Sequence, residues 1–520
     1  MKKHANILAL LMAVLCLAAV LCGCGGGEPT GTAPVSSPEV GSPTSQPSSE
    51  SDSITVGIAQ DLDDSLDPHR MEAAGTREVL FNVFEGLVKP DSEGNLIPAV
   101  ASDYVVSDSG DVFTFTLRDG IRFHNGAPVT VGDVVFSLER CMGTDGGEAL
   151  VDGFSAIESV EATDDKTVVI TLREGSPEFL ASLTAAIIPA DYDDQATAPV
   201  GTGPFRFVSR TPQESVVLER FDDYWGEKAY LKTVTFKIID NASTLVMSLK
   251  SGAIDLCAHL TAVQAAELPS EFTILEGTMN LVQAVYLNNA VEPLNNVKVR
   301  QAMSHAINRE EIMLYLADGR GTPVGSSMYP AFGKYFLPEL ADYYSYDVEQ
   351  AKALLTEAGY PDGFALEITV PSNYQPHMDT ATVVVEQLKA IGITATIKPV
   401  EWSTWLSDTY TGRNFQATVI GFDAKTLTAQ AMLARWASDA DNNMINFSNE
   451  EYDQTLAAAM AATDEDEQVA LYKRCQEILT EQAANLYIQD MCDLVAMKDS
   501  LEGYAFYPLY AMDLSTVRYK

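Results

Sequence analysis

Cys24 is the residue whose position most clearly predicts chemistry. It follows Lys2, Lys3 and a wholly apolar run from Ile7 to Leu21. A charged start, a short apolar stretch and a small residue before the cut are typical of an export signal. The run is shorter than the ~20 residues that a helix needs to cross the hydrocarbon core. We therefore expect cleavage directly before this cysteine rather than a permanent anchor.

The string Leu21-Cys22-Gly23-Cys24 resembles a bacterial lipobox, in which the cysteine after the cut receives lipid. We expect residues 1–23 to be a signal peptide and Cys24 to tie the chain to the outer face of the cell membrane. The alternative is an ordinary secretory signal with a chance cysteine. Residues 24–53 are rich in Gly, Pro and Ser and nearly devoid of large apolar side chains, which predicts a flexible linker.

Composition and charge limit the function classes. The chain has 33 Lys and Arg against 73 Asp and Glu, a formal net charge of −40, so nucleic acid is not an expected partner. The same charge opposes adsorption of the body to anionic lipid. At 46% hydrophobic residues the composition is globular. The body from residue 54 onward is too long for one core, and we expect two or three lobes.

No set of residues with the spacing of a catalytic or metal site is present. The sequence has no nucleophile elbow, no HExxH string and no CxxC pair. Four cysteines are scattered through the body, and we expect reduced or buried thiols rather than disulfides: Cys141, Cys257, Cys475 and Cys492. We expect no enzyme activity, no cofactor and no metal site.

Local patterns indicate a mixed α/β body. Phe113, Phe115 and Leu117 alternate with threonines, and Asp119-Gly120 predicts a tight turn into a returning strand at 121–123. Three pairs have the spacing of a helix N-cap and its third residue, and each predicts a helix start: Thr130 with Asp133, Asn308 with Glu311, and Asp347 with Gln350. The glycine-rich string at 201–207 lacks a phosphate-loop ending and predicts a turn into a strand.

Several long strings resemble the family 5 extracellular solute-binding proteins, the dipeptide-, oligopeptide- and nickel-type receptors of ABC importers. The resemblance covers about residues 54 to 520 in the family's own order. The strings are LDPHR (66–70), FNVFEGLV (81–88), FTLRDGIRFHNGAPVTVGDVVFSLER (115–140), PVGTGPFRF (199–207), DDYWG (222–226), LKSGAID (249–255) and VKVRQAMSHAINREEI (297–312).

This resemblance implies a two-lobed, hinged fold of the type II periplasmic-binding-protein kind, with an extra inserted domain. Lobe I would comprise 54–86, 199–286 and 486–520, the insert 87–198, and lobe III 287–485. The ligand would be a small solute or oligopeptide enclosed between the lobes and delivered to the transmembrane permease subunits by a monomeric receptor. His124 and Arg300 would serve turns and packing rather than ligand binding.

The resemblance also implies which residues face the ligand. Trp402 and Phe422 match positions where dipeptide-type members place aromatic side chains against the ligand, whereas Trp405, one helical turn on, is expected to pack. Met279, Asn280 and Tyr286 resemble the hinge-side strand that lies along the ligand. A structural role in the core is the alternative for each of them.

Two departures from the family concern charge. Dipeptide-type members carry an aspartate for the peptide ammonium where this chain has Lys425, with Asp423 two places earlier. They also place an arginine for the peptide carboxylate in the segment that corresponds to 371–380, which here contains no Lys or Arg. We therefore expect a longer peptide, or a ligand that is not a peptide, with Asp423 and Lys425 at the cleft.

Three other functions stay open from the sequence. His69 and His377 could ligate a metal chelate of the nickel-receptor kind, although they share no motif. The same aromatic residues could stack on an oligosaccharide. An extracellular hydrolase would need a catalytic cluster. An adhesion lipoprotein that binds no solute would need a cleft without a ligand.

Overall fold

The computed structural model describes residues 52–62, 64–143, 149–151 and 153–520. The expected signal peptide, Cys24 and nearly all of the expected linker lie outside these residues. Within the described part, no helix combines the length and the apolar character needed to cross a membrane.

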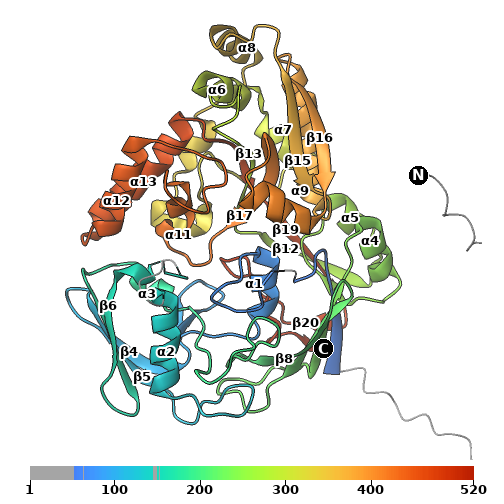
Figure 1. Ribbon diagram of the computed structural model, residues 1–520. Helices are drawn as coiled ribbons and strands as arrows, with labels where there is room; N and C mark the ends of the chain where they lie inside the picture. Colours follow the sequence, from blue (N-terminus) through green and yellow to red (C-terminus); the bar gives the residue numbers. More distant parts are fainter. Residues whose placement is uncertain (1–51, 63, 144–148, 152) are drawn as a thin grey trace, which may run out of the picture. The chain divides into compact units, whose positions relative to one another are not determined.

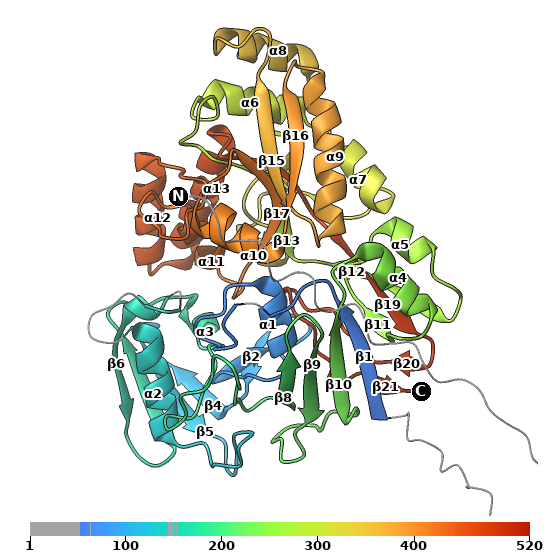
Figure 2. The same ribbon diagram turned by 45° about the vertical axis from the view of Figure 1, so that its right-hand side comes forward.

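Most of the strands belong to three sheets (Figures 1 and 2). The first sheet has the order β12 (Phe272–Thr278), β19 (Cys492–Lys498), β11 (Leu256–Cys257), β1 (Ser53–Ile58), β10 (Thr233–Ile238), β9 (Ser215–Arg220), β8 (Phe205–Thr211). The second has the order β14 (Thr322–Pro323), β18 (Asn485–Asp490), β13 (Leu281–Leu287), β17 (Ala417–Asp423), β15 (Ala365–Pro371), β16 (Thr394–Val400). The third has the order β4 (Ala101–Val106), β5 (Val112–Leu117), β7 (Thr167–Leu172), β6 (Ile157–Ala162). Two small pairs join β2 (Val88–Pro90) to β3 (Leu96–Pro98) and β20 (Leu501–Glu502) to β21 (Arg518–Tyr519).

The helices follow the chain in this order: α1 (Ala74–Leu80), α2 (Val131–Met142), α3 (Phe179–Ser182), α4 (Ala242–Lys250), α5 (Ala262–Ala266), α6 (Val297–Ala306), α7 (Arg309–Ala317), α8 (Val348–Glu357), α9 (Gln375–Lys389), α10 (Trp402–Thr404), α11 (Ala429–Leu433), α12 (Glu450–Ala461) and α13 (Glu465–Glu481). All three expected caps are present: Thr130 and Asp133 form a capping box at α2, and Asn308 and Asp347 accept from the third backbone N–H of α7 and α8.

The second sheet is covered on both faces, which explains why β13 is buried along its whole length. Val282 and Tyr286 point into a core shared with α11 to α13, whereas Val285 and Leu287 point into a core shared with α6 to α9. Figures 1 and 2 show α11 to α13 on one side of β13 and β17, and α7 and α9 on the other. Successive strand residues face opposite sides, so an unbroken apolar run suits a strand between two helical layers.

The chain crosses between the first and second sheets at two adjacent points. Met279 and Asn280 join β12 to β13, and Met491 joins β18 to β19. The Met279 N–H donates to the Met491 carbonyl at 2.9 Å, and Asn280 has a left-handed backbone with φ 57°. We call these residues the crossover. Asparagine tolerates this conformation better than most residues, and here it turns the chain from one sheet to the other.

Two details differ from the sequence-based expectations. The expected lobe I extended to residue 286 and resumed at 486, but β13 and β18 pair within the second sheet, so the exchange occurs at 279–280 and 491. The expected returning strand at 121–123 is also wrong. Only an isolated bridge from Arg122 to Pro128 forms there, because β4 and β7 already occupy both edges of β5.

The four body cysteines are buried and unbonded, as expected. Burial raises the pKa of Cys492 to about 11, so its thiol stays protonated at neutral pH. His124 and Arg300 have the structural roles predicted for them. His124 lies 3.0 Å from the Gly203 carbonyl, and Arg300 donates to the carbonyls of Leu294, Gln482 and Ala483.

Candidate ligand-binding site

Three cavities meet where α1, the end of β17 and the C-terminal segment converge. The large cavity has about 300 Å³ and lies beside Phe81, Phe84 and Leu427. The cleft cavity has about 100 Å³ and is lined by Trp402 and Phe422 among others. The inner cavity has about 80 Å³. Tyr510 lines all three, so they belong to one site rather than to separate parts of the molecule.

Two ion pairs join α1 and the residues before it to the end of β17. One guanidinium nitrogen of Arg77 donates to both carboxylate oxygens of Asp423, at 2.7 and 2.6 Å, and both side chains are largely buried. Lys425 lies 3.2 Å from Glu72, and this second pair is exposed. A buried pair of this kind is strongly coupled, whereas the exposed one contributes little. Asp423 and Lys425 therefore both line the cleft cavity and are both already paired, and their contact with a ligand stays a prediction.

The start of α1 is fixed by Asp64, and this positions Glu72 and Arg77. The Asp64 carboxylate accepts from the backbone N–H of Glu72 at 2.8 Å and of Ala73 at 2.9 Å, and also from the Thr76 hydroxyl. The Arg77 guanidinium also donates to the Glu72 carbonyl. Several hydrogen bonds thus hold the cation in place before any ligand arrives.

Aromatic side chains form one wall of the cleft cavity. Trp402 is half-buried, stacks on Trp405 with centroids 5.2 Å apart, and meets the Tyr374 ring edge-on at 5.5 Å. Trp405 is fully buried and donates to the Thr418 hydroxyl, so it packs as expected. Phe422 is half-buried, and the guanidinium of Arg435 lies 4.0 Å from its ring centroid. Trp402 and Phe422 both line the cleft cavity.

Several buried polar atoms of the site have no hydrogen-bond partner. They are Nε2 of Gln60, both amide atoms of Asn373, and Nε1 of Trp402. Gln60 and Asn373 line the inner cavity and Trp402 the cleft cavity. A buried donor or acceptor without a partner costs roughly 1–3 kcal/mol, so such atoms mark places where a ligand can gain hydrogen bonds.

His377 lines both smaller cavities and stays neutral. Burial lowers the pKa of its imidazole to about 3. Its Nδ1 lies 3.0 Å from Nε2 of Gln283, an amide donor. The imidazole therefore accepts at Nδ1, and its proton is on Nε2. A neutral donor at this place suits a carbonyl oxygen better than a metal ion.

A charged histidine lines the inner cavity. His259 lies 2.8 Å from Glu78 through Nε2 and 3.0 Å from Asp493 through Nδ1, and it stacks on Tyr510 with centroids 4.8 Å apart. Burial acts to lower the pKa of His259, but the carboxylates of Glu78 and Asp493 outweigh it and raise the pKa well above its ordinary value. The His259 imidazolium is paired with both carboxylates. Because Glu78 lies on α1 and Asp493 on β19, this cation links α1 to the first sheet.

The remaining predicted residues lie at the crossover or in the core. Met279 is buried and lines the inner cavity. Asn280 donates to the Thr278 and Tyr507 carbonyls, so its side chain fixes the crossover. Tyr286 is fully buried behind Phe422, and its hydroxyl donates to the Val282 carbonyl. Tyr286 lines none of the three cavities. Its position therefore does not support the predicted contact with a ligand, which stays a prediction.

His69, the first histidine of the metal-chelate alternative, is not free to bind a metal. His69 lies 2.8 Å from the Ala186 carbonyl through Nε2 and accepts from Arg140 at Nδ1, so both ring nitrogens are occupied. Burial lowers its pKa to about 4. Across the described residues, no group of three or more His, Cys, Asp or Glu side chains is arranged to hold a metal ion.

Sequence reasoning missed Arg77, Tyr374, Arg435 and Tyr510. Arg77 and Asp423 lie 346 positions apart, and no local pattern links them. Tyr374 and Asn373 come from the segment 371–380, which was noted for its missing basic residue and for His377. Arg435 supplies a basic group to the cleft cavity from a different place in the chain.

Comparisons with known proteins place this geometry in context. Residues 95–444 match the family model described as bacterial extracellular solute-binding proteins, family 5 Middle. The chain is 28% identical over 451 residues to heme-binding protein A of Haemophilus influenzae, covering 79% of this chain and 82% of that protein. It is 27% identical over 454 residues to the dipeptide-binding protein of Escherichia coli, covering 80% and 84%. The structure of the periplasmic binding protein DppA from Helicobacter pylori, in complex with the peptide STSA, has a TM-score of 0.79 at 27% identity, covering 90% of this chain and 98% of that one.

Proposed function

Because this chain belongs to the bacterial extracellular solute-binding proteins of family 5, we propose that it captures an oligopeptide outside the cytoplasm and delivers it to the permease of an ABC importer. The family consists of transport receptors rather than enzymes, and the fold is that of type II periplasmic binding proteins. The oligopeptide as ligand goes beyond family membership, since a relative named for heme and one named for dipeptides are about equally similar to this chain.

The observation that carries the proposal is that residues lining the two smaller cavities have polar atoms without a hydrogen-bond partner. Gln60, Asn373 and Trp402 together offer donors and an acceptor, and the neutral His377 offers a further donor. Peptide main chain presents alternating carbonyl and N–H groups and can pair with such a set. The ring of Trp402 adds apolar contact that does not select one side chain.

The alternatives are less well supported. A metal chelate would need free histidines, but His69 is fully hydrogen-bonded and His377 presents a proton rather than a lone pair. An oligosaccharide would stack on an aromatic face, and because Trp405 covers one face of Trp402, only the other face could take part. Oligosaccharides are therefore included in the ligand screen described below.

We also propose that the two sheets, with the helices that cover them, act as lobes that move about the crossover. Ligand contacts on both sides of the site would favour the closed arrangement by their differential affinity for it. Arg77 and Glu72 lie on one side, and Asp423 and Lys425 on the other, and their ion pairs join the two sides in this structure.

The membrane attachment is proposed from the sequence alone. Lipid on Cys24 would hold the receptor at the membrane beside its permease. Residues 24–53 would act as a flexible linker that lets the folded body move relative to the membrane. Intact-mass analysis of detergent-extracted protein should show a diacylglyceryl adduct on a chain that begins at Cys24. Cys24→Ser should release the protein from the membrane, whereas Cys22→Ser should not. Retention of the Cys24→Ser protein would contradict the lipid anchor.

A thermal-shift screen tests the ligand class. Binding stabilises the folded state by RT ln(1 + [L]/Kd), so the shift at fixed concentration ranks ligands. Tri- to pentapeptides should stabilise the protein more than free dipeptides, oligosaccharides or nickel–histidine chelates. Selective stabilisation by an oligosaccharide or a chelate, with no effect of any peptide, would overturn the oligopeptide proposal.

A further inference from the structure

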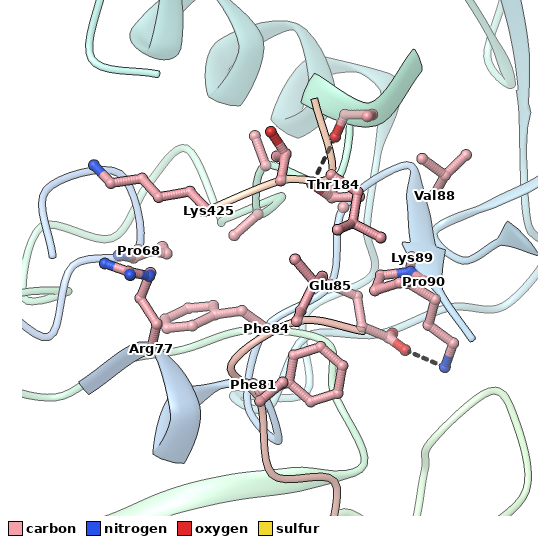
Figure 3. Close-up of a pocket in the computed structure, with 18 of the residues that line it drawn as sticks. Pro68, Arg77, Phe81, Phe84, Glu85, Val88, Lys89, Pro90, Thr184 and Lys425 are labelled. Carbon is pink, nitrogen blue, oxygen red and sulfur yellow. Dashed lines mark hydrogen bonds and ion pairs between the residues drawn. The ribbon is translucent and has the colours of Figure 1, made fainter. Parts of the chain in front are cut away.

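The large cavity has walls of a different kind from those of the two smaller cavities. Its lining includes half-buried apolar side chains from several segments that are distant in sequence: Met71, Phe81, Phe84, Leu96, Leu427 and Leu509. Figure 3 shows Arg77 and Lys425 together at one side of this cavity, the Glu85–Lys89 pair at another, and Phe81 and Phe84 between them. Apolar surface thus separates the charged groups.

The polar groups at the edge of this cavity are already satisfied. Glu85 accepts from Lys89 at 2.9 Å, from the Tyr224 hydroxyl at 2.6 Å and from the Trp225 indole at 2.7 Å. Arg77 is paired with Asp423. Among the described residues, no side chain that lines the large cavity has a buried polar atom without a partner. Water held there gains few hydrogen bonds, whereas an apolar group gains burial.

The large cavity and the cleft cavity share a boundary. Arg77, Asp423, Lys425 and Tyr510 line both of them. A ligand that occupies both cavities must therefore pass the Arg77–Asp423 pair. The cleft cavity offers about 100 Å³ and the large one about 300 Å³, so the bulky part of such a ligand fits the latter.

We propose that the large cavity is the subsite for a large apolar side chain at one end of a peptide of at least three residues. The peptide main chain lies in the cleft and inner cavities, where the unpartnered polar atoms are. The end with the apolar side chain extends past Arg77 and Asp423 and packs against Phe81, Phe84 and Leu427. The inference rests on the proposed peptide function and adds to it a preference for ligand length and for the terminal side chain.

The test uses three tripeptides and calorimetric titration of the protein: Ala-Ala-Ala, Phe-Ala-Ala and Ala-Ala-Phe. One of the two phenylalanine peptides should bind at least about tenfold more tightly than trialanine, because a phenyl ring leaves water for an apolar wall. Leu427→Trp fills the cavity from a half-buried loop position and should abolish this preference. Leu314→Trp, at a leucine 63% exposed on α7, is the matched control and should retain the preference.

The outcomes separate this inference from the function on which it rests. Equal affinity for all three peptides, or a preference that survives in Leu427→Trp, would overturn the subsite but leave the peptide receptor intact. Failure of all three peptides to bind would overturn the peptide function and the subsite together. The thermal midpoint of each ligand-free variant checks folding, and equal affinities of the three tripeptides for the unmodified protein would overturn the subsite even if one variant does not fold.

Discussion

Asp490 provides a test of the crossover, because it is a carboxyl group that the fold keeps neutral. It ends β18 beside Met491 and is fully buried. Its Oδ1 accepts from the Leu281 N–H at 3.2 Å, while Oδ2 has no partner. Burial raises the pKa of Asp490 from 3.8 to about 8. Folding near neutral pH must therefore bind a proton at this position.

The size and sign of the effect follow from linkage. The folded pKa lies above the unfolded one, so the folded state binds more protons between about pH 4 and pH 8, and stability falls as pH rises through that window. Each pKa unit corresponds to about 1.36 kcal/mol. Between pH 5 and pH 8 the cost from Asp490 grows by roughly 3–4 kcal/mol.

Asp490→Asn removes this proton requirement and can keep the Leu281 hydrogen bond through its amide oxygen. Urea unfolding followed by tryptophan fluorescence, at pH 5 and pH 8, measures the difference between variant and unmodified protein. The variant's relative stability should rise by roughly 3–4 kcal/mol between the two pH values. Asp119→Asn, at an aspartate whose side chain is 81% exposed, is the control and should show no such change. An identical pH response in Asp490→Asn and the unmodified protein would mean that the folded protein holds Asp490 ionised and would refute the reasoning.

Two further predictions concern the site. Arg77→Ala and Asp423→Ala should each destabilise the ligand-free protein, and a double-mutant cycle should give a coupling energy of roughly 1–3 kcal/mol; strict additivity would mean that the pair does not form in solution. Trp402→Phe removes an unpartnered indole N–H, so ligand-free stability should hold while peptide affinity falls about five- to tenfold, measured by calorimetry. Loss of ligand-free stability with unchanged affinity would instead give Trp402 a core role.

Features that depend on neighbouring residues could be predicted from the sequence. Helix starts at Thr130, Asn308 and Asp347 are correct because an N-cap hydrogen bond spans only three residues. The turn at 201–204 also leads into β8, as expected from its lack of a phosphate-loop ending. These features need no knowledge of the rest of the fold.

Strand partners could not be predicted in the same way. β13 was expected in lobe I because the family resemblance implied a boundary at residue 286, but its pairing with β17 lies about 135 positions away and decides its sheet. Tyr286 shows, for a single residue, that the local sequence does not determine what a side chain contacts. Whether it faces a ligand or a core depends on which helices cover that face of β13, and α11 to α13 cover it.

The site was predicted in part, and its charges were not. The family strings led to Trp402, Phe422 and Asp423, which do line the cleft cavity. The missing ammonium-binding aspartate and carboxylate-binding arginine suggested a site without an electrostatic clamp. The fold instead supplies Arg77 from α1 and Arg435 from the short 3-10 helix Ala434–Trp436 after α11, at positions where the dipeptide pattern gave no reason to look.

The position of α1 shows why the Arg77–Asp423 pair bears on ligand choice. Neighbouring residues on a helix point in directions about 100° apart. Arg77 therefore reaches Asp423 while Glu78 reaches His259. A ligand that separates the first pair leaves two largely buried charges, which costs roughly 3–5 kcal/mol unless it replaces both partners. A peptide carries an ammonium and a carboxylate and can satisfy each of them, whereas the neutral hydroxyls of a sugar supply only dipoles. The same pair that holds the ligand-free site together therefore favours a zwitterionic ligand over a neutral one.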